Sequence, residues 1–152
     1  MGTLTTKITE NFTGLNGLEK TTTTLSLTDI DFVDKRIMMA TLTERPVATF
    51  AAFSQAGGYI VGDVRYLRIT NQDSTNFVWL TFKNLSAEDR FALKLDAGQS
   101  YYLNGDNATG LSDFFVANDS GDAVVGQARD VENIRVLADT APCQIELYLA
   151  SV

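Results

Sequence analysis

The residues of this chain that are best able to do chemistry are carboxylates that lie close together in the sequence. Asp29, Asp31 and Asp34 form one group, and Glu88 and Asp89 form another. A carboxylate pair serves acid–base catalysis when a cleft raises one pKa and the two groups stand roughly 5 to 10 Å apart. The residues around both groups are typical of turns. We therefore interpret these carboxylates as parts of solvated loops, with a hydrolase that uses two of the aspartates as a remote alternative.

The chain has few of the histidine and cysteine residues that nucleophilic catalysis and zinc binding commonly use. The chain has no histidine and a single cysteine, Cys143. It therefore lacks a Ser–His or Cys–His relay, an internal disulfide and the zinc patterns that need histidine or several cysteines. Cys143 precedes an alternating apolar run by two residues, which favours a small packed residue at the start of a strand. We expect a protein that is not an enzyme and that uses no cofactor.

Two segments, 104–113 and 118–122, are rich in the oxygen ligands that calcium prefers. Neither fits the EF-hand loop, which has glycine at its sixth position and glutamate at its twelfth. Asn, Asp and Gly are also the residues that ordinary turns prefer. We expect no metal site, and leave calcium open for these two loops.

The charge balance bears on the choice of partner. The net charge is -7 with a pI near 4.4, and the twelve Lys and Arg residues are scattered. Binding to nucleic acid depends largely on clustered Lys and Arg that displace counterions, so we expect no nucleic-acid partner. No apolar run approaches the ~20 residues that cross a bilayer, and residues 1–10 lack the pattern of a secretory signal. We expect a soluble protein made inside the cell, with no membrane partner.

The elements that must position these residues are strands. Apolar and polar residues alternate with a period of two in the segments 64–71, 77–84, 91–96, 133–136 and 144–149. Clusters of Asn, Asp, Ser and Gly separate them, as in segments 71–74, 96–98, 104–107 and 118–122. Segments 36–43 and 46–53 also read as strands, and 86–90 reads as one helical turn at most. The pattern predicts an all-β chain, an antiparallel β-sandwich or jelly-roll-like domain.

The first thirty residues read differently from the rest. Threonine is frequent in segments 3–6 and 21–24, and β-branched residues favour extended backbone. We interpret residues 1–30 as an N-terminal arm or edge segment and residues 31–152 as the sandwich domain. The alternative, that the early strands belong to the same sandwich, stays open. The residues expected to contact a partner are the apolar ones of the arm: Leu4, Ile8, Phe12, Leu15 and Leu18.

Aromatic residues point to a second candidate surface. Tyr101 and Tyr102 are adjacent, so in a strand one of them must face away from the core. The pair at 114–115 repeats that arrangement, and Trp79 shares a face with the residue at 77. Outward aromatic side chains supply either a sugar platform or a subunit interface. We assign Trp79, Tyr102 and Phe115 to an oligomer or ligand surface.

The order of these segments resembles small β-sandwich proteins of tailed-phage particles. The resemblance covers about residues 63–150: a strand ending in Ile69-Thr70-Asn71, an alternating apolar strand, a strand continuing into 95–101 and a final pair of strands. It implies a capsid decoration or cement protein. Such a protein is expected to form homotrimers, to bind the major capsid protein or other virion proteins, and to reside in the virion after assembly in the host cytoplasm. A tail or fibre-associated module and a carbohydrate-binding module are the alternatives.

Overall fold

The computed structural model describes residues 1–14, 17–51, 57–83, 90–105, 110–111 and 131–152. Its described part is all β apart from one short 3-10 turn, η1 (Val61–Asp63). The prediction of an all-β, sandwich-like domain is confirmed. The strands are β1 (Gly2–Gly14), β2 (Gly17–Ile30), β3 (Phe32–Ala40), β4 (Arg45–Ala51), β5 (Tyr59–Ile60), β6 (Val64–Asn71), β7 (Val78–Lys83), β8 (Arg90–Leu95), β9 (Ser100–Asn104), β10 (Asn133–Ala138) and β11 (Cys143–Ser151).

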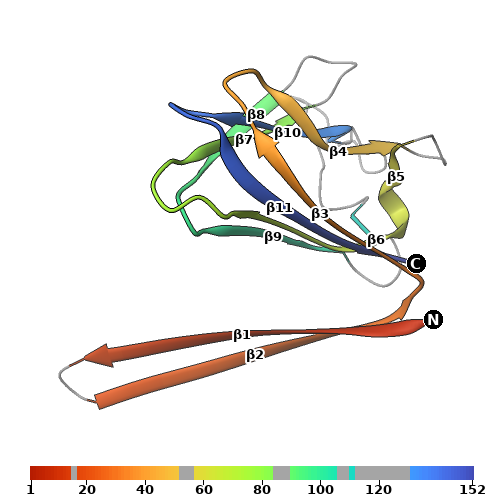
Figure 1. Ribbon diagram of the computed structural model, residues 1–152. Helices are drawn as coiled ribbons and strands as arrows, with labels where there is room; N and C mark the ends of the chain where they lie inside the picture. Colours follow the sequence, from red (N-terminus) through yellow and green to blue (C-terminus); the bar gives the residue numbers. More distant parts are fainter. Residues whose placement is uncertain (15–16, 52–56, 84–89, 106–109, 112–130) are drawn as a thin grey trace, which may run out of the picture.

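Two sheets pack face to face to form the body of the molecule (Figure 1). One has the order β5-β4-β10-β7-β8 and the other has the order β3-β11-β6-β9. Consecutive strands often lie in opposite sheets: β6 is followed by β7, and β10 by β11. Nearly all neighbouring strands are antiparallel, the exception being the short β4–β5 pair.

Alternating residues fill the space between the sheets, as the period of two predicts. Leu67 and Ile69 of β6 face Leu80 and Phe82 of β7 across one continuous core, and all four side chains are fully buried or nearly so. Cys143 is buried at the first position of β11, which confirms its interpretation as a small packed residue. Each fully buried Leu, Ile or Phe contributes about 1.5–3 kcal/mol to folding.

The turn after β6 shows how the Asn and Asp clusters reverse the chain. Asn71 is fully buried, and its side-chain amide donates to the carbonyls of Asn76 and Leu95 at 2.9 and 3.2 Å. Its side-chain oxygen accepts the backbone N–H of Asp73 at 3.0 Å. The Asp73 carboxylate in turn accepts the backbone N–H groups of Thr75 and Asn76 at 2.8 and 2.7 Å. These hydrogen bonds lower the pKa of Asp73 from its ordinary value.

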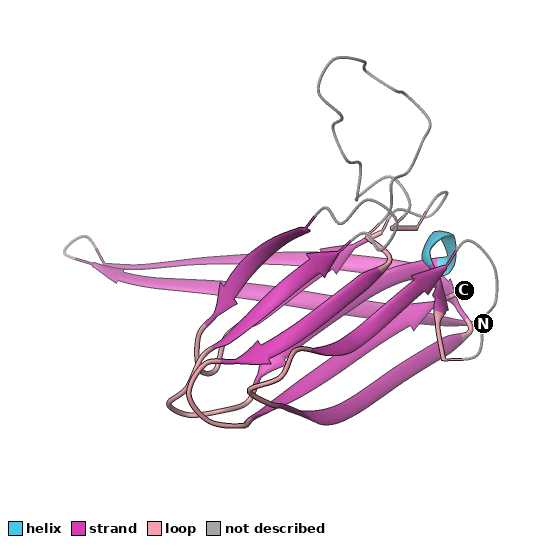
Figure 2. Ribbon diagram, turned by 90° about the horizontal axis from the view of Figure 1, so that it is seen from above, coloured by secondary structure: helices cyan, strands magenta, loops and turns pink. Residues whose placement is uncertain are grey.

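Strands β1 and β2 form a separate two-stranded hairpin that we call the arm. Its register runs from Gly2 opposite Ile30 to Gly14 opposite Gly17. Gly17 has a φ of 112°, a conformation that L side chains rarely adopt. Figures 1 and 2 show the arm leaving the base of the sandwich, and in Figure 2 its far end extends beyond the two sheets. Thirteen extended residues span about 40 Å.

The base of the arm is fastened to the sandwich. Leu27 and Ile30 are buried in a small cluster with Tyr66 and Ala150, and Leu4 packs against it together with Leu25 and Tyr148. The backbone N–H of Asp31 donates to the Ser151 carbonyl at 3.0 Å, and the Asp31 carboxylate pairs with the N-terminal amine at 3.0 Å. The arm therefore has a fixed root.

Several predicted features lie outside the described residues. They are most of the helical turn expected at 86–90, the carboxylates at 88 and 89, most of the oxygen-rich segment 104–113 and all of segment 118–122.

Candidate functional site

The far half of the arm exposes large apolar side chains. Ile8 is 47% exposed and Phe12 is 65% exposed, whereas Leu4 is half-buried at the root. Of the other residues that the sequence assigned to the arm, Leu18 lies in β2 and Leu15 lies outside the described residues. The apolar row Leu4, Ile8 and Phe12 therefore begins on the sandwich and continues into solvent.

The two faces of the arm differ in chemistry. Residues two apart share a face of a strand, so Leu4, Ile8 and Phe12 lie on one face, and the register places Leu27 opposite Leu4 on it. The other face carries Thr5, Lys7, Thr9 and Asn11, and opposite them the partners Ser26, Thr24, Thr22 and Lys20. Thr9 and Thr22 share a hydrogen bond of 3.2 Å between their hydroxyls on this polar face. We call the first face the apolar face of the arm.

The end of the apolar face is acidic. Glu10 lies two residues from Phe12 on the same strand, and Glu19 lies directly opposite Phe12 on β2. Phe12 therefore lies next to two carboxylates, at the end of a face that also carries Thr6, Thr21 and Thr23.

A second surface is the outer face of the four-stranded sheet, which we call the outer face. Alternate residues of each strand point out of the sandwich and form this face. They include Val33, Lys35, Ile37, Met39, Tyr66, Arg68, Thr70, Gln72, Ser100, Tyr102, Glu146, Tyr148 and Ala150. The root of the arm packs on one end of this face, against Tyr66, Tyr148 and Ala150.

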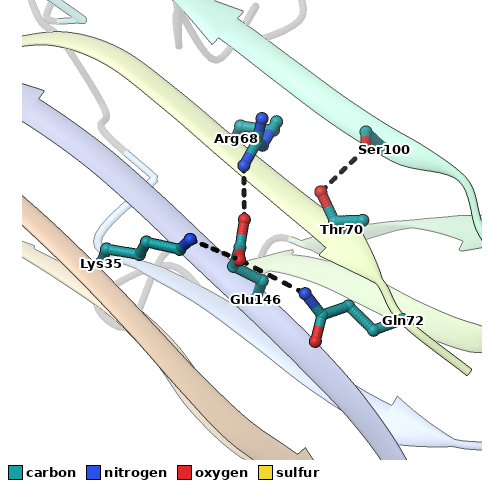
Figure 3. A network of polar contacts seen from close by, with 6 residues as sticks. All are labelled: Lys35, Arg68, Thr70, Gln72, Ser100 and Glu146. Carbon is teal, nitrogen blue, oxygen red and sulfur yellow. Dashed lines mark hydrogen bonds and ion pairs between the residues drawn. The ribbon is translucent and has the colours of Figure 1, made fainter.

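A polar network occupies the middle of the outer face (Figure 3). The Glu146 carboxylate is nearly buried and accepts from Arg68, from Lys35 at 3.3 Å and from Gln72 at 3.2 Å. The Arg68 guanidinium also lies over the Tyr148 ring, 5.5 Å from its centroid. Burial acts to raise the pKa of Glu146, but the hydrogen bonds from Lys35 and Arg68 outweigh it and hold the pKa below its ordinary value. Two cations share one carboxylate, which leaves the network with a net positive charge.

Exposed apolar side chains border this network along β3. Val33, Ile37 and Met39 are 47%, 56% and 50% exposed. β3 is an edge strand of its sheet, so these side chains have a neighbouring strand on one side only. Their alternation with Asp34 and Arg36 is the pattern of an ordinary half-buried strand, so the sequence alone does not mark them as exposed.

The predicted aromatic surface is divided by the fold. Tyr102 is 45% exposed on the outer face, while its neighbour Tyr101 turns inward against Phe82, with ring centroids 5.3 Å apart. Trp79 is 37% exposed on the opposite side of the sandwich, where it meets Phe77 edge to face at 5.6 Å. Trp79 and Tyr102 therefore lie on opposite sides of the molecule and do not share a ligand. Phe115 lies outside the described residues.

The carboxylates near residue 30 differ from the sequence interpretation in two cases. Asp29 lies at the end of β2, and Asp34 is part of β3 rather than a loop. Asp34 accepts from the Tyr59 hydroxyl and from Arg36 at 2.8 Å. Arg36 also donates to the Val47 carbonyl at 3.3 Å and to Tyr59 at 2.6 Å. Burial, followed by the hydrogen bond with Asp34, raises the pKa of Tyr59. Asp34, Arg36 and Tyr59 line a cleft of about 360 Å³. Their hydrogen bonds, with the one to Val47, join β3 to β4 and β5 and so connect the two sheets.

Among the residues that the structure describes, no group of three or more His, Cys, Asp or Glu side chains is placed to hold a metal ion. The same residues include no helix long and apolar enough to cross a membrane. Comparison with family models, with curated proteins and with solved structures gives no match for this chain.

Proposed function

We propose that this protein is a structural, assembly component of a virus particle, a capsid cement or decoration subunit that binds neighbouring protein subunits through its arm. One observation carries the proposal. The chain builds a hairpin about 40 Å long, roots it in the sandwich, and leaves its distal apolar side chains Ile8 and Phe12 exposed.

Without a partner, the arm leaves backbone hydrogen-bonding groups unpaired along its edges and apolar side chains exposed to water. An isolated two-stranded hairpin is marginally stable in water, and both of its strands present unpaired edge groups. Covering Ile8 and Phe12 contributes about 1.5–3 kcal/mol for each fully buried side chain. Both properties favour an arm that works against another protein surface.

The arm is also organised before it binds. Its backbone is paired from Gly2 to Gly14, and its root is held by the cluster around Leu27 and Ile30. A disordered segment would lose roughly 1–2 kcal/mol of backbone entropy for each residue ordered on docking. A preformed hairpin avoids most of that cost, so a few exposed side chains suffice for useful affinity.

The virus particle is proposed as the setting for three reasons. The order of strands from residue 63 onward resembles tailed-phage sandwich proteins. The acidic chain, with its scattered basic residues, suits contacts with protein rather than with nucleic acid. Many copies on one shell would also multiply modest single contacts through avidity.

The test is reconstitution on particles. Particles are purified from the native source of the chain, stripped of it, and mixed with recombinant full-length chain before gradient centrifugation. The matched variant replaces residues 8–23 by an Asn-Gly turn between Lys7 and Thr24, which keeps the root. We expect the full-length chain to sediment with the particles and the shortened chain to stay at the top of the gradient.

Two results would contradict the proposal. One is the absence of the chain from purified particles by mass spectrometry. The other is equal rebinding of the shortened variant, provided that circular dichroism shows both proteins folded.

A further inference from the structure

We infer that the arm docks on a second copy of this chain, and that the receiving surface is the outer face of the sheet β3-β11-β6-β9. The inference rests on the proposed function and names the partner of the same arm. Each copy supplies one arm and one outer face, so an exchange between copies covers both surfaces.

The arm and the outer face already contact each other within one chain. At the root, Leu4, Leu25 and Leu27 from the apolar face of the arm pack on Tyr66, Tyr148 and Ala150 of the outer face. These two surfaces are therefore complementary where they meet. Both surfaces continue past the contact, the arm through Ile8 and Phe12 and the sheet through Ile37 and Met39.

Beyond this contact, both surfaces are left uncovered in a single copy. Ile8 and Phe12 are exposed on the arm, and Val33, Ile37 and Met39 are exposed on the sheet. Figure 1 shows the arm diverging from the sheet beyond its root, and Figure 2 shows its end beyond the sandwich. The far end of one arm therefore does not cover the face of its own chain but is free to reach another.

The charges of the two surfaces are also complementary. The end of the apolar face carries Glu10 two residues before Phe12 and Glu19 opposite it. The outer face carries Lys35 and Arg68 against the single carboxylate of Glu146. In a chain of net charge -7 this is a cationic surface, and opposite potentials favour the pairing of arm end with outer face.

The experiment is a charge-swap complementation on the full-length chain, read by sedimentation velocity. An arm variant carries Glu10→Lys and Glu19→Lys, which repels the cationic outer face. A face variant carries Met39→Glu, an exposed position that leaves the Lys35–Glu146–Arg68 network in place. We expect wild-type protein to self-associate, and each variant alone to associate at least tenfold more weakly. An equimolar mixture should recover assembly, because the lysines introduced on the arm then meet the carboxylate introduced at position 39, while the unaltered arm meets the unaltered face.

Uncharged truncations and control variants distinguish a specific loss of association from a general loss of folded structure. Phe12→Ala and Ile37→Ala should each weaken association about tenfold, as an interface residue worth about 1.4 kcal/mol does. Asn11→Ala on the polar face of the arm and Trp79→Ala on the opposite sheet should associate as wild type does. A wild type that stays monomeric at about 10⁻⁴ M would overturn the inference, because even a weak specific contact is detectably formed at that concentration. A mixture of the two variants that stays dissociated would also overturn it.

The same proteins distinguish the two proposals. If the wild type is monomeric yet rebinds particles through its arm, the docking partner is another virion protein and the exchange between copies is wrong. If the complementation works but the chain is absent from particles, the exchange stands and the virus setting is wrong.

Discussion

The arm and the sandwich use the same antiparallel pairing but bury very different amounts of side chain. In the sandwich each strand turns one face onto the opposite sheet, so Leu67, Leu147 and Ile134 are fully buried. In the arm the apolar row leaves the core after its root, and Phe12 at the far end is 65% exposed. Both regions are paired through backbone hydrogen bonds. The sandwich is stabilised in addition by a large apolar core, whereas the arm has buried apolar contacts only at its root.

The difference shows where folding energy and binding energy are held. A buried leucine stabilises the folded chain, whereas an exposed phenylalanine contributes little until a partner covers it. The apolar residues of the sandwich are therefore expected to control stability, and those of the arm to control association. Four predictions test this division, from the largest expected effect to the smallest.

Truncating a core residue should have the largest effect. Leu147→Ala removes a fully buried side chain from the middle of β11, and we expect the free energy of unfolding to fall by about 2–5 kcal/mol. Ile8→Ala on the arm is the matched control and should change it by less than about 0.5 kcal/mol. Urea titrations followed by circular dichroism measure both. Equal losses of unfolding free energy in the two variants would show that the arm and the sandwich do not differ in their contribution to stability.

Two asparagines in strands give the next comparison. Asn71 is fully buried with its amide and carbonyl both hydrogen-bonded, so Asn71→Ala should cost about 2 kcal/mol. Asn11 lies on the exposed arm opposite Lys20, and Asn11→Ala should be close to neutral. The measurement is the midpoint of thermal unfolding at low protein concentration. A neutral Asn71→Ala would show that the turn after β6 does not depend on that side chain.

The outer face should show acid sensitivity. Because the pKa of Glu146 is lowered in the folded chain, its stabilisation is present above the ordinary glutamate pKa and is lost as pH falls below it. Glu146→Gln should therefore cost about 1 kcal/mol at neutral pH and flatten the loss of stability between about pH 5 and pH 3. Parallel pH curves for wild type and Glu146→Gln would rule out this role.

Phe12→Ala should have the smallest effect on the stability of the isolated chain, below about 0.5 kcal/mol. The same substitution should weaken self-association strongly, by about tenfold. Unfolding is measured at nanomolar concentration by intrinsic fluorescence, and association by sedimentation at micromolar concentration. A large loss of stability in dilute protein would mean that Phe12 supports the sandwich itself.

Local pattern was enough to locate most strands of the sandwich. The alternating segments at 64–71, 77–84, 133–136 and 144–149 correspond to β6, β7, β10 and β11, since the period of two directly reflects one buried face. Segment 36–43 corresponds only roughly to β3, which begins four residues earlier and ends three residues earlier. Segment 46–53 corresponds to β4, which begins one residue earlier, and residues 52–53 lie outside the described residues. Adjacent Tyr101 and Tyr102 face opposite ways, as the strand period requires.

Local sequence pattern predicted less of the candidate site than of the fold. The exposed residues Val33, Ile37 and Met39 have the same alternation as a strand with one buried face, so no local pattern marks them as surface. Trp79 and Tyr102 look alike in the sequence, but the sheet to which each strand belongs separates them. The contacts of Asp34 with Tyr59 span 25 residues, and no spacing rule anticipates them.

The sequence by itself determined the class of structure. Strand period, β-branched residues and turn clusters act within a few neighbouring residues, and they specify an all-β chain with an unusual Thr-rich start. The tertiary structure alone decided that residues 2–30 pair with each other and that the outer face lies beside their root. Such choices depend on which strands meet across long separations. They are settled by the burial of whole faces, which no short stretch of sequence records.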